Sequence, residues 1–323
     1  MSNKEKIIEL IRENDQMSID QLSEEVGISL SMIHRYMRQL LEENLVQKIG
    51  TAPHVFYALM EQQGEVQQFD FSKDSRNIIN QNFLFISARG ERVDGIGGFV
   101  RWCKKRNFDV VKKADEYVSI YNKYEKLKEL GVISGQSKMN DTFGELLCID
   151  DVFYADFYAW EIFGKTKLGQ LLLYSKQSQD KKMMKEVVGE IEATVKKIIK
   201  TKKIDAVGFI PPTVRRQTQL MKMLQKYLNI ALPVVEIIKV QTDVITPQKT
   251  LNKLQDRIEN ANNTIFVKEN NNYKNVLLID DAVGSGATLN QVACKIKKKN
   301  IVQKVYGFAV TGSAKGFDVI SEV

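Results

Sequence analysis

The segment 276–289 constrains the fold of this chain more than any other, because it combines a strand, two acids, a loop of small residues and the start of a helix. It reads Val-Leu-Leu-Ile-Asp-Asp-Ala-Val-Gly-Ser-Gly-Ala-Thr-Leu. The apolar run 276–279 is typical of a parallel strand that is buried on both faces. Asp280 and Asp281 follow where that strand should end, and a helical pattern runs over 289–299. This order predicts a ligand site at the carboxyl end of a parallel strand.

The loop between the two acids and the helix has the composition of an anion site. Its glycines let backbone N–H groups approach a phosphate, and the helix N-terminus adds a favourable field. Two carboxylates would repel a phosphate, so they should hold sugar hydroxyls, a divalent cation, or both. A ligand with a ribose ring, a 5′-phosphate and Mg²⁺ satisfies every part of the pattern. The alternative is an ordinary strand–turn–helix in which the acids cap the turn, and it requires the whole pattern to be coincidence.

The stretch resembles the phosphoribosyl-diphosphate (PRPP) signature of the type I phosphoribosyltransferases. The resemblance implies that Asp280 and Asp281 hold the ribose hydroxyls, that the loop wraps the 5′-phosphate, and that PRPP itself carries Mg²⁺. The family usually has Ser or Thr where this chain has Gly284, so one hydroxyl donor is missing, while Ser285 and Thr288 keep two. The expected phosphate-binding residues are Val283, Gly284, Ser285, Gly286, Ala287 and Thr288.

Length and composition fit a globular protein of two or three domains, with 323 residues and 43% hydrophobic content. No run approaches the ~18 apolar residues of a membrane span, and no secretory stretch opens the chain. We therefore expect a cytoplasmic protein without a membrane partner. Cys103, Cys148 and Cys294 are far apart in sequence, which predicts neither a zinc cluster nor a disulfide framework. The net charge of +7 permits nucleic-acid or polyphosphate partners.

Residues 1–60 have the pattern of a winged helix-turn-helix. Helices are expected at 4–14, 18–25 and 29–43, and short strands at 45–48 and 56–59. The second helix opens with a Ser-x-x-Gln capping box, a glycine follows it, and Ser29 can cap the third helix. The spacing of apolar residues and of the glycine resembles that of bacterial winged-helix regulators.

The third of these helices is the predicted DNA-facing element. Acids outnumber bases over 1–60, but no acid lies between Val26 and Leu41. A helical stretch without acids can face phosphates and base edges. The expected DNA contacts are Ser29, Ser31, His34, Arg35 and Arg38. A winged helix used for dimerisation or protein docking is the alternative, since the same fold serves both uses. Winged-helix readers often bind paired half-sites as dimers, so a homodimer is a further expected partner.

Residues 61–147 show no recognisable chemistry. A polar linker is expected at 61–68, a strand at 83–87 and a long helix at 109–130. The glycine-rich loop 89–98 leads into a basic and aromatic segment, which fits either a surface that grips phosphate or single strands or a turn before a half-buried helix. The half-buried helix is the simpler interpretation.

From residue 148 to the end, strands alternate with helices. This alternation predicts a mostly parallel sheet with helices on both faces. Further strands are expected at 206–210, 234–239 and 305–310. The first of these ends in two prolines, and Arg215 and Arg216 follow. Two arginines beyond the carboxyl end of a strand suit a diphosphate.

This half of the chain resembles the ComF-type phosphoribosyltransferases, which are associated with DNA uptake. Three blocks carry the resemblance: Ile-Pro-Pro with Arg-Arg-Gln-Thr-Gln over 210–219, Thr-Pro-Gln-Lys-Thr-Leu at 246–251 followed by Arg257, Asn260 and Phe266, and the PRPP motif. The resemblance implies a type I phosphoribosyltransferase-like domain over 148–323. The family's cysteine-rich zinc ribbon is absent, and Arg216 stands where the family usually has glycine.

If the domain is catalytic, the resemblance implies transfer of a phosphoribosyl group from Mg²⁺–PRPP to an unidentified nitrogen acceptor. Asp280 and Asp281 would fix the ribose, and Arg215 and Arg216 would stabilise the leaving diphosphate. Further residues expected around the diphosphate and the segment 241–263 are Pro212, Thr213, Lys239 and Arg257.

Two other functions remain open. A winged helix joined to a phosphoribosyltransferase fold is the architecture of the Gram-positive purine repressors, in which PRPP is an effector and catalysis is absent. The chain would then be a non-catalytic regulator whose ligand binds its DNA-competent and incompetent states unequally. A DNA-uptake or DNA-processing accessory protein would use the fold as a scaffold. Catalysis predicts diphosphate release, the sensor predicts PRPP binding without turnover, and the scaffold predicts no PRPP binding.

Overall fold

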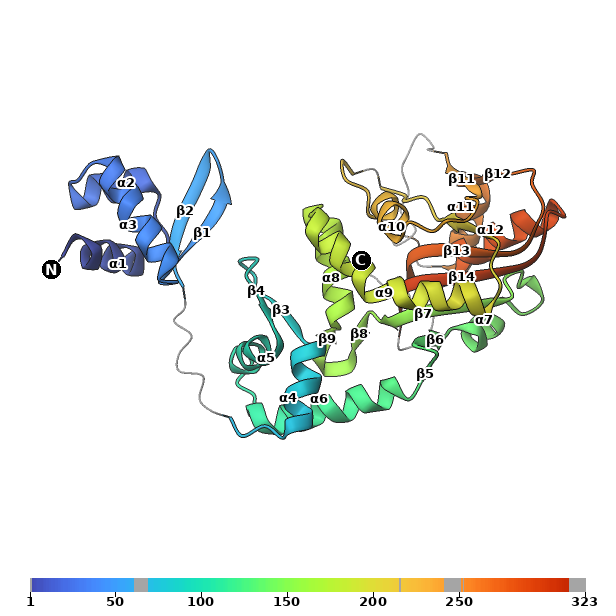
Figure 1. Ribbon diagram of the computed structural model, residues 1–323, viewed down its shortest axis with the longest axis horizontal. Coiled ribbons are helices and arrows are strands. Elements are labelled where there is room, and N and C mark those ends of the chain that lie inside the picture. The colour runs from blue at the N-terminus through green and yellow to red at the C-terminus, as the bar shows by residue number, and fades with distance from the viewer. Residues whose placement is uncertain (1, 61–68, 215, 241–250, 252, 314–323) are drawn as a thin grey trace. The chain divides into compact units, whose positions relative to one another are not determined.

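The protein divides into two compact units, Met1–Asp70 and Phe71–Val323, each with its own hydrophobic core (Figure 1). The structure is a computed structural model that describes residues 2–60, 69–214, 216–240, 251 and 253–313. The linker expected at 61–68 lies outside the described residues.

The first unit is a winged helix-turn-helix, as predicted. Its elements are α1 (Asn3–Glu13), α2 (Ile19–Val26), α3 (Leu30–Glu42), β1 (Val46–Thr51) and β2 (His54–Leu59). The two strands form an antiparallel hairpin, with Val46 opposite Leu59. The core between the helices includes Ile7, Leu22 and Ile33, which have no exposed surface. Because one face of each helix supplies this core, the opposite face of α3 is left for solvent.

Local capping explains where these helices begin and end. The Ser18 hydroxyl accepts the N–H of Gln21, and the Gln21 side chain accepts the N–H of Ser18, so the predicted capping box is confirmed. Gly27 ends α2 with a φ of +78°, a conformation that costs glycine little. The Ser29 hydroxyl accepts the N–H of Met32 and so caps α3.

A six-stranded, mostly parallel sheet forms the centre of the second unit, with the strand order β10-β13-β14-β7-β6-β5. The strands are β10 (Ala206–Phe209), β13 (Tyr273–Val283), β14 (Val302–Gly312), β7 (Asp151–Phe157), β6 (Val132–Ser134) and β5 (Lys128–Glu129). The first four strands run parallel to one another. At the edge of the sheet, β6 pairs antiparallel with β7, and β5 pairs antiparallel with β6. The predicted mixed α/β architecture is thereby confirmed. The strand expected at 234–239 begins with a parallel bridge from Val234 to Val207 of β10 and continues as β11 (Glu236–Lys239), which pairs antiparallel with β12 (Ile265–Lys268) in a two-stranded sheet.

Helices cover both faces of this sheet. The helices α8 (Lys167–Ser178), α9 (Lys181–Thr201) and α10 (Leu220–Leu228) share a core with Phe308 of β14. A Cβ at the neighbouring Gly307 would instead contact Leu289 of α12 (Ala287–Lys298) at 3.3 Å. Since successive residues of a strand point to opposite faces, α12 lies across the sheet from α8, α9 and α10. On that side α12 packs against α11 (Leu254–Thr264).

Residues 71–147 belong to this second unit. They form α4 (Lys73–Asn82), β3 (Leu84–Ile86), β4 (Arg92–Asp94), α5 (Gly95–Lys104), α6 (Val110–Glu125), the edge strands β5 and β6, and α7 (Gln136–Phe143), with a 3-10 turn at Gly144–Leu146. The aromatic side chains Phe99 and Trp102 of α5 are buried beside Phe83 and Phe163. They are therefore not available to stack on bases, and the interpretation of a half-buried helix is confirmed. The short elements β8 (Ala159–Trp160), Glu161–Phe163 (3-10) and β9 (Gly164–Lys165) follow β7.

Cys148 and Cys294 form a disulfide, so the expectation of no disulfide is wrong. The two residues are 146 positions apart in sequence. Hydrogen bonds made by Asn290 of α12 join the segment around Cys148 to the helix that carries Cys294. The buried side chain of Asn290 accepts the N–H groups of Cys148 and Ile149 and donates to the carbonyl of Leu146. Sequence spacing carries no information about such a long-range approach. Among the described helices, none is both long and apolar enough to cross a membrane.

Candidate functional site

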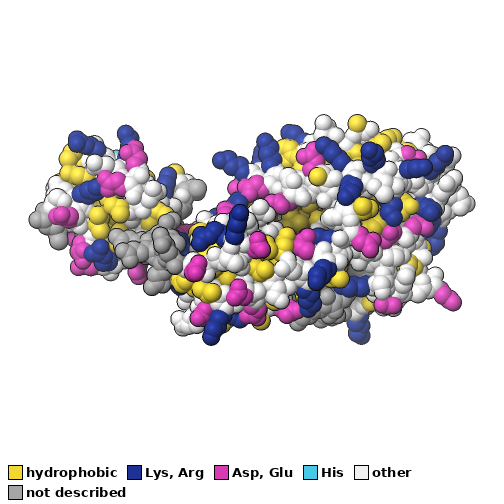
Figure 2. All heavy atoms as spheres, turned by 60° about the horizontal axis from the view of Figure 1, so that its bottom comes forward, with side chains coloured by type: hydrophobic (Ala, Val, Ile, Leu, Met, Phe, Trp, Pro, Cys, Tyr) yellow, Lys and Arg dark blue, Asp and Glu magenta, His cyan; other side chains and the backbone are white. Residues whose placement is uncertain are grey.

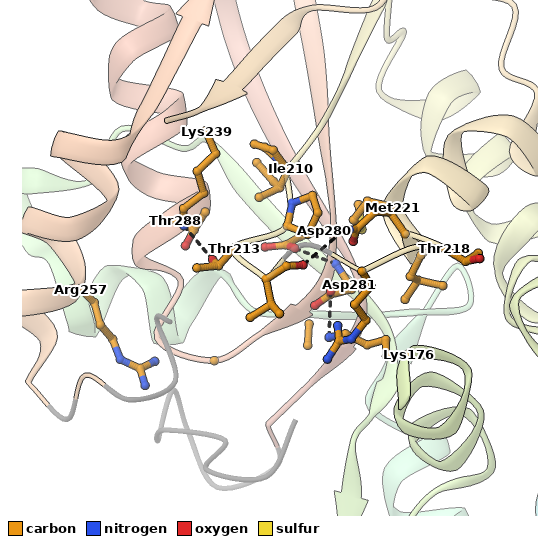
Figure 3. A pocket seen from close by; sticks show the side chains of 18 residues that line it. Lys176, Ile210, Thr213, Thr218, Met221, Lys239, Arg257, Asp280, Asp281 and Thr288 are labelled. Atoms are coloured by element: carbon orange, nitrogen blue, oxygen red, sulfur yellow. Dashed lines mark hydrogen bonds and ion pairs between the residues drawn. The ribbon is translucent and has the colours of Figure 1, made fainter. Parts of the chain in front are cut away.

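The acidic pair lies within β13, beside the end of β10, because β13 continues past the expected end of the strand to Val283. Phe209 of β10 is in register with Ile279 of β13, and the N–H of Ile210 donates to the carbonyl of Ile279. The loop that leaves β10 therefore begins directly beside Asp280. Figure 3 shows Ile210 and Thr213 next to Asp280 and Asp281. This is the edge of an open α/β sheet at which ligands bind.

A cavity of about 200 Å³ opens at this edge. It brings together many of the residues that the sequence predicted: Pro212, Thr213, Arg216, Lys239, Arg257, Asp280, Asp281, Gly284 and Thr288. Arg215 and the block 246–250 lie outside the described residues. The residues that line the cavity run from Lys176 to Thr288, which are 112 positions apart in the chain.

Burial dominates the electrostatics of the acidic pair. Desolvation at the end of β13, together with the neighbouring charge of Asp281, raises the pKa of Asp280 to about 7. The N–H of Asp281 donates to Asp280 Oδ1 at 2.7 Å and, with Lys176 and Lys239, opposes this rise in the pKa. As a carboxylate, Asp280 accepts hydrogen bonds with both of its oxygens.

Lys176 completes the acidic pair, and sequence reasoning missed it. Its Nζ lies 2.9 Å from Asp281 Oδ2, and the two side chains are only 14% and 21% exposed. Lys176 stands in the last turn of α8, more than a hundred residues before Asp281. No sequence signal distinguished this lysine from others near helix ends. One oxygen of Asp281 thus has a cationic partner.

Lys239 and Thr213 form a second polar contact on the wall of the cavity. Lys239 Nζ donates to Thr213 Oγ1 at 2.7 Å. Burial lowers the pKa of Lys239, and the charge of Asp280 opposes that decrease. The structure therefore joins two residues that were predicted separately (Figure 3).

The loop 283–288 forms a smaller cavity of about 90 Å³ at the N-terminus of α12. Val283, Gly284, Ser285, Gly286, Ala287 and Thr288, all of the predicted phosphate-binding residues, line it together with Arg257 and Asp280. Gly286 has a φ of +73°, and a Cβ there would overlap Met139 Sδ of α7. Since no other residue could take this position without moving Met139, α7 supports the loop from behind.

The predicted DNA-facing residues all lie on the exposed side of the first unit. Ser29, Ser31, His34, Arg35 and Arg38 are exposed, whereas Ile33 and Met37 of the same helix are buried. Within residues 2–60, neither Arg35 nor Arg38 forms an ion pair with an acid. On the face drawn in Figure 2, by contrast, Lys and Arg side chains are interspersed with Asp and Glu.

Comparison with known proteins bears on the first unit. Residues 2–47 match the family model described as winged helix-turn-helix DNA-binding. This match, together with the fold of α1 to α3, supports DNA binding by this unit. No curated protein matches the chain. The α/β unit is therefore interpreted from its own geometry.

Proposed function

We propose that this protein is a DNA-binding regulator whose α/β unit binds PRPP with Mg²⁺, and whose affinity for DNA depends on that binding. The observation that carries the proposal is the joining of Asp280 and Asp281 to the cradle 283–288 at one edge of the sheet. Carboxylates suit the ribose hydroxyls, and a helix N-terminus with a glycine-rich loop suits a phosphate. A DNA-binding unit in the same chain favours regulation over transfer alone.

The remaining groups around the larger cavity fit the diphosphate of such a ligand. Arg216, Lys239 and Thr213 supply two cations and a hydroxyl on the side of the cavity formed by the loop after β10. Among the described residues, no group of three or more His, Cys, Asp or Glu could hold a metal ion. In this proposal Mg²⁺ arrives on the diphosphate and neutralises its charge, and the protein orients the ribose and the phosphates.

Regulation requires a difference in affinity between two states of the protein. PRPP shifts the binding of DNA only if it binds the DNA-competent and DNA-incompetent states unequally. By linkage, DNA must then change the affinity for PRPP by the same factor. The coupling can be measured from either side.

The test is calorimetric titration with Mg²⁺–PRPP, followed by fluorescence anisotropy of labelled DNA with and without PRPP. Wild-type protein should bind PRPP, and its DNA affinity should change by about 5- to 150-fold when PRPP is saturating. The variant Asp280→Asn/Asp281→Asn should lose PRPP binding by at least about 100-fold, since it loses charged partners of two hydroxyls. Its DNA affinity should no longer respond to PRPP. Absence of PRPP binding by the wild type would disprove the proposal and leave the fold as a scaffold.

Phosphoribosyl transfer is the second candidate function. The larger cavity continues past the acidic pair to Ile210, Leu220 and Met221, which form an apolar wall. Such a wall suits a flat nitrogen acceptor lying beside C1′ of the ribose. Transfer predicts that diphosphate is released from PRPP in equal amount to the acceptor consumed, and that Asp281→Asn abolishes the release. PRPP binding without release of diphosphate for any nitrogen base or ammonia supports the regulator alone.

A further inference from the structure

Arg257 lies against the phosphate loop at the N-terminus of α12. It extends from α11, is 6% exposed and lines the smaller cavity together with residues 283–289. Its Nη1 atom lies 3.6 Å from the place where a Cβ of Gly284 would be. In Figure 3, Arg257 and Lys176 come from opposite sides of the acidic pair, and Arg257 lies on the side of Thr288.

Contacts between α11 and α12 hold Arg257 in this position. Arg257 Nε donates to the carbonyl of Leu251 at 2.7 Å, which fixes the plane of the guanidinium. Lys295 of α12 donates to the carbonyls of Asn262 and Ile265 at the end of α11. The helix α11, which carries Arg257, is therefore hydrogen-bonded to α12, which follows the phosphate loop. The guanidinium and the N–H groups of the loop thus form one preorganised set of donors.

Arg257 borders the position at which the missing hydroxyl donor would lie. A Cβ at position 284 would be at an ordinary van der Waals distance from Arg257 Nη1, 3.6 Å. The hydroxyl donor that Ser or Thr would supply at this position is missing from the loop. A guanidinium donates two hydrogen bonds in a plane and carries a charge, so it binds a phosphate more strongly than a hydroxyl does.

We infer that Arg257 binds the 5′-phosphate of the ribose ligand and takes the place of the hydroxyl donor that Gly284 lacks. The inference rests on the proposed function and makes it more specific. Arg257 then determines that the ligand is a ribose 5-phosphate and not an unphosphorylated ribose. Under this inference Arg257 binds the 5′-phosphate, and Arg216, Lys239 and Thr213 bind the diphosphate.

The experiment separates the two phosphate sites by their ligands. Binding of PRPP, ribose 5-phosphate and inorganic diphosphate, each with Mg²⁺, is measured by calorimetry for the wild type and for Arg257→Met. The variant should weaken the binding of PRPP and of ribose 5-phosphate by about 10- to 100-fold. Its affinity for inorganic diphosphate should stay within about twofold of the wild type. The opposite pattern, or an equal loss for all three ligands, would overturn the inference.

A second pair of variants tests the exchange between the arginine and the hydroxyl. Gly284→Ser in the Arg257→Met background restores a hydroxyl donor where the guanidinium has left room, and should recover part of the lost affinity for ribose 5-phosphate. Arg257→Lys keeps a cation and should lose less than Arg257→Met. Thermal unfolding of every variant identifies any that fail to fold, and Arg257→Lys then carries the comparison alone. If Gly284→Ser in the Arg257→Met background recovers nothing and Arg257→Lys weakens diphosphate as much as ribose 5-phosphate, Arg257 is not the 5′-phosphate donor.

Failure of the inference can be told apart from failure of the proposed function. Wild-type protein that binds neither PRPP nor ribose 5-phosphate contradicts both. Wild-type protein that binds PRPP with an affinity that Arg257→Met does not change contradicts the inference about Arg257 and leaves the PRPP site standing.

Discussion

The DNA-facing helix of the first unit and the cavity of the second differ in how they are built. All of the polar residues predicted to contact DNA lie on α3 or at its cap, within the ten positions from Ser29 to Arg38. The cavity draws Lys176, Lys239, Arg257 and Asp281 from four separate elements. A surface on one helix depends on local folding, whereas the cavity depends on the packing of the whole unit. Changes in the core of the second unit should therefore damage the cavity and spare α3.

The two sites also differ in how their charges meet water. Arg35 and Arg38 are exposed, so salt screens their attraction to phosphates. Asp280 is desolvated beside Asp281, which raises its pKa toward neutrality. Salt should therefore control the binding of DNA, and pH should control the binding of the ligand.

The largest effect is expected for Arg35→Ala/Arg38→Ala. Removal of two phosphate-facing cations should weaken DNA binding by about 10- to 100-fold and reduce the slope of log K against log salt by about 2. Arg12→Ala is the matched control, because Arg12 is an exposed arginine of α1 that pairs with Glu9. Anisotropy titrations at several salt concentrations measure both quantities. An unchanged slope would mean that α3 does not face the DNA backbone.

Lys176→Met should weaken the binding of PRPP by about tenfold at neutral pH. Loss of Lys176 removes the partner of Asp281 and one of the charges that oppose the raised pKa of Asp280, so Asp280 becomes harder to ionise. Lys167→Met on the same helix is the control, since Lys167 pairs with Glu190 instead. The affinity for DNA without PRPP should stay the same in both variants. Equal losses in both would show that α8 acts through stability and not through Asp281.

The affinity for PRPP should rise several-fold between pH 6 and pH 8. Asp280 accepts hydrogen bonds from the ribose hydroxyls best as a carboxylate. Its pKa of about 7 places its ionisation in this interval. At a pH above the ordinary pKa of Asp, Asp280 still holds its proton in the folded state but has lost it in the unfolded state. The contribution of Asp280 to the free energy of unfolding therefore falls as the pH rises toward 7. Asp280→Asn should flatten the dependence on pH of the affinity for PRPP, measured by calorimetry. It should also flatten the dependence on pH of the free energy of unfolding, measured by chemical unfolding. A wild-type affinity that does not depend on pH would contradict the raised pKa.

The smallest effect is expected at the cap of α3. Ser29→Ala removes the acceptor for the N–H of Met32 and should lower the free energy of unfolding of the first unit by about 1 kcal/mol. Ser31→Ala, whose hydroxyl contacts Ser29 Oγ at 2.9 Å but accepts no N–H of the helix, should change it by less than about 0.5 kcal/mol. Unfolding in urea, followed by a signal from the first unit, measures the difference. Equal effects of the two substitutions would argue against the cap.

Much of the first unit could be predicted from sequence, because its signals act over a few residues. The Ser18 capping box, the left-handed Gly27 and the cap at Ser29 all form between positions at most four apart. The segment from 276 to 289 was predicted in part: β13 runs through the acidic pair to Val283, and the loop and α12 then follow in the expected order. A local pattern survives folding when its hydrogen bonds close within the element itself.

The residues around that motif could not be predicted. Met139, in a segment without recognisable chemistry, packs behind Gly286, and Lys176 reaches Asp281 from α8. The disulfide between Cys148 and Cys294 likewise joins segments 146 positions apart. None of these contacts has a spacing, a periodicity or a composition that would mark it in the chain.

The sequence by itself determined the capped helices, the strand with its acidic pair and the loop of small residues, since each depends on hydrogen bonds and apolar spacing among near neighbours. Only the tertiary structure decided which lysine neutralises Asp281, which arginine lies against Gly284 and which side chain supports the loop. Those contacts form because burial of the sheet faces brings distant helices to one edge. Their chemistry follows from that desolvation, which no single segment of the chain encodes.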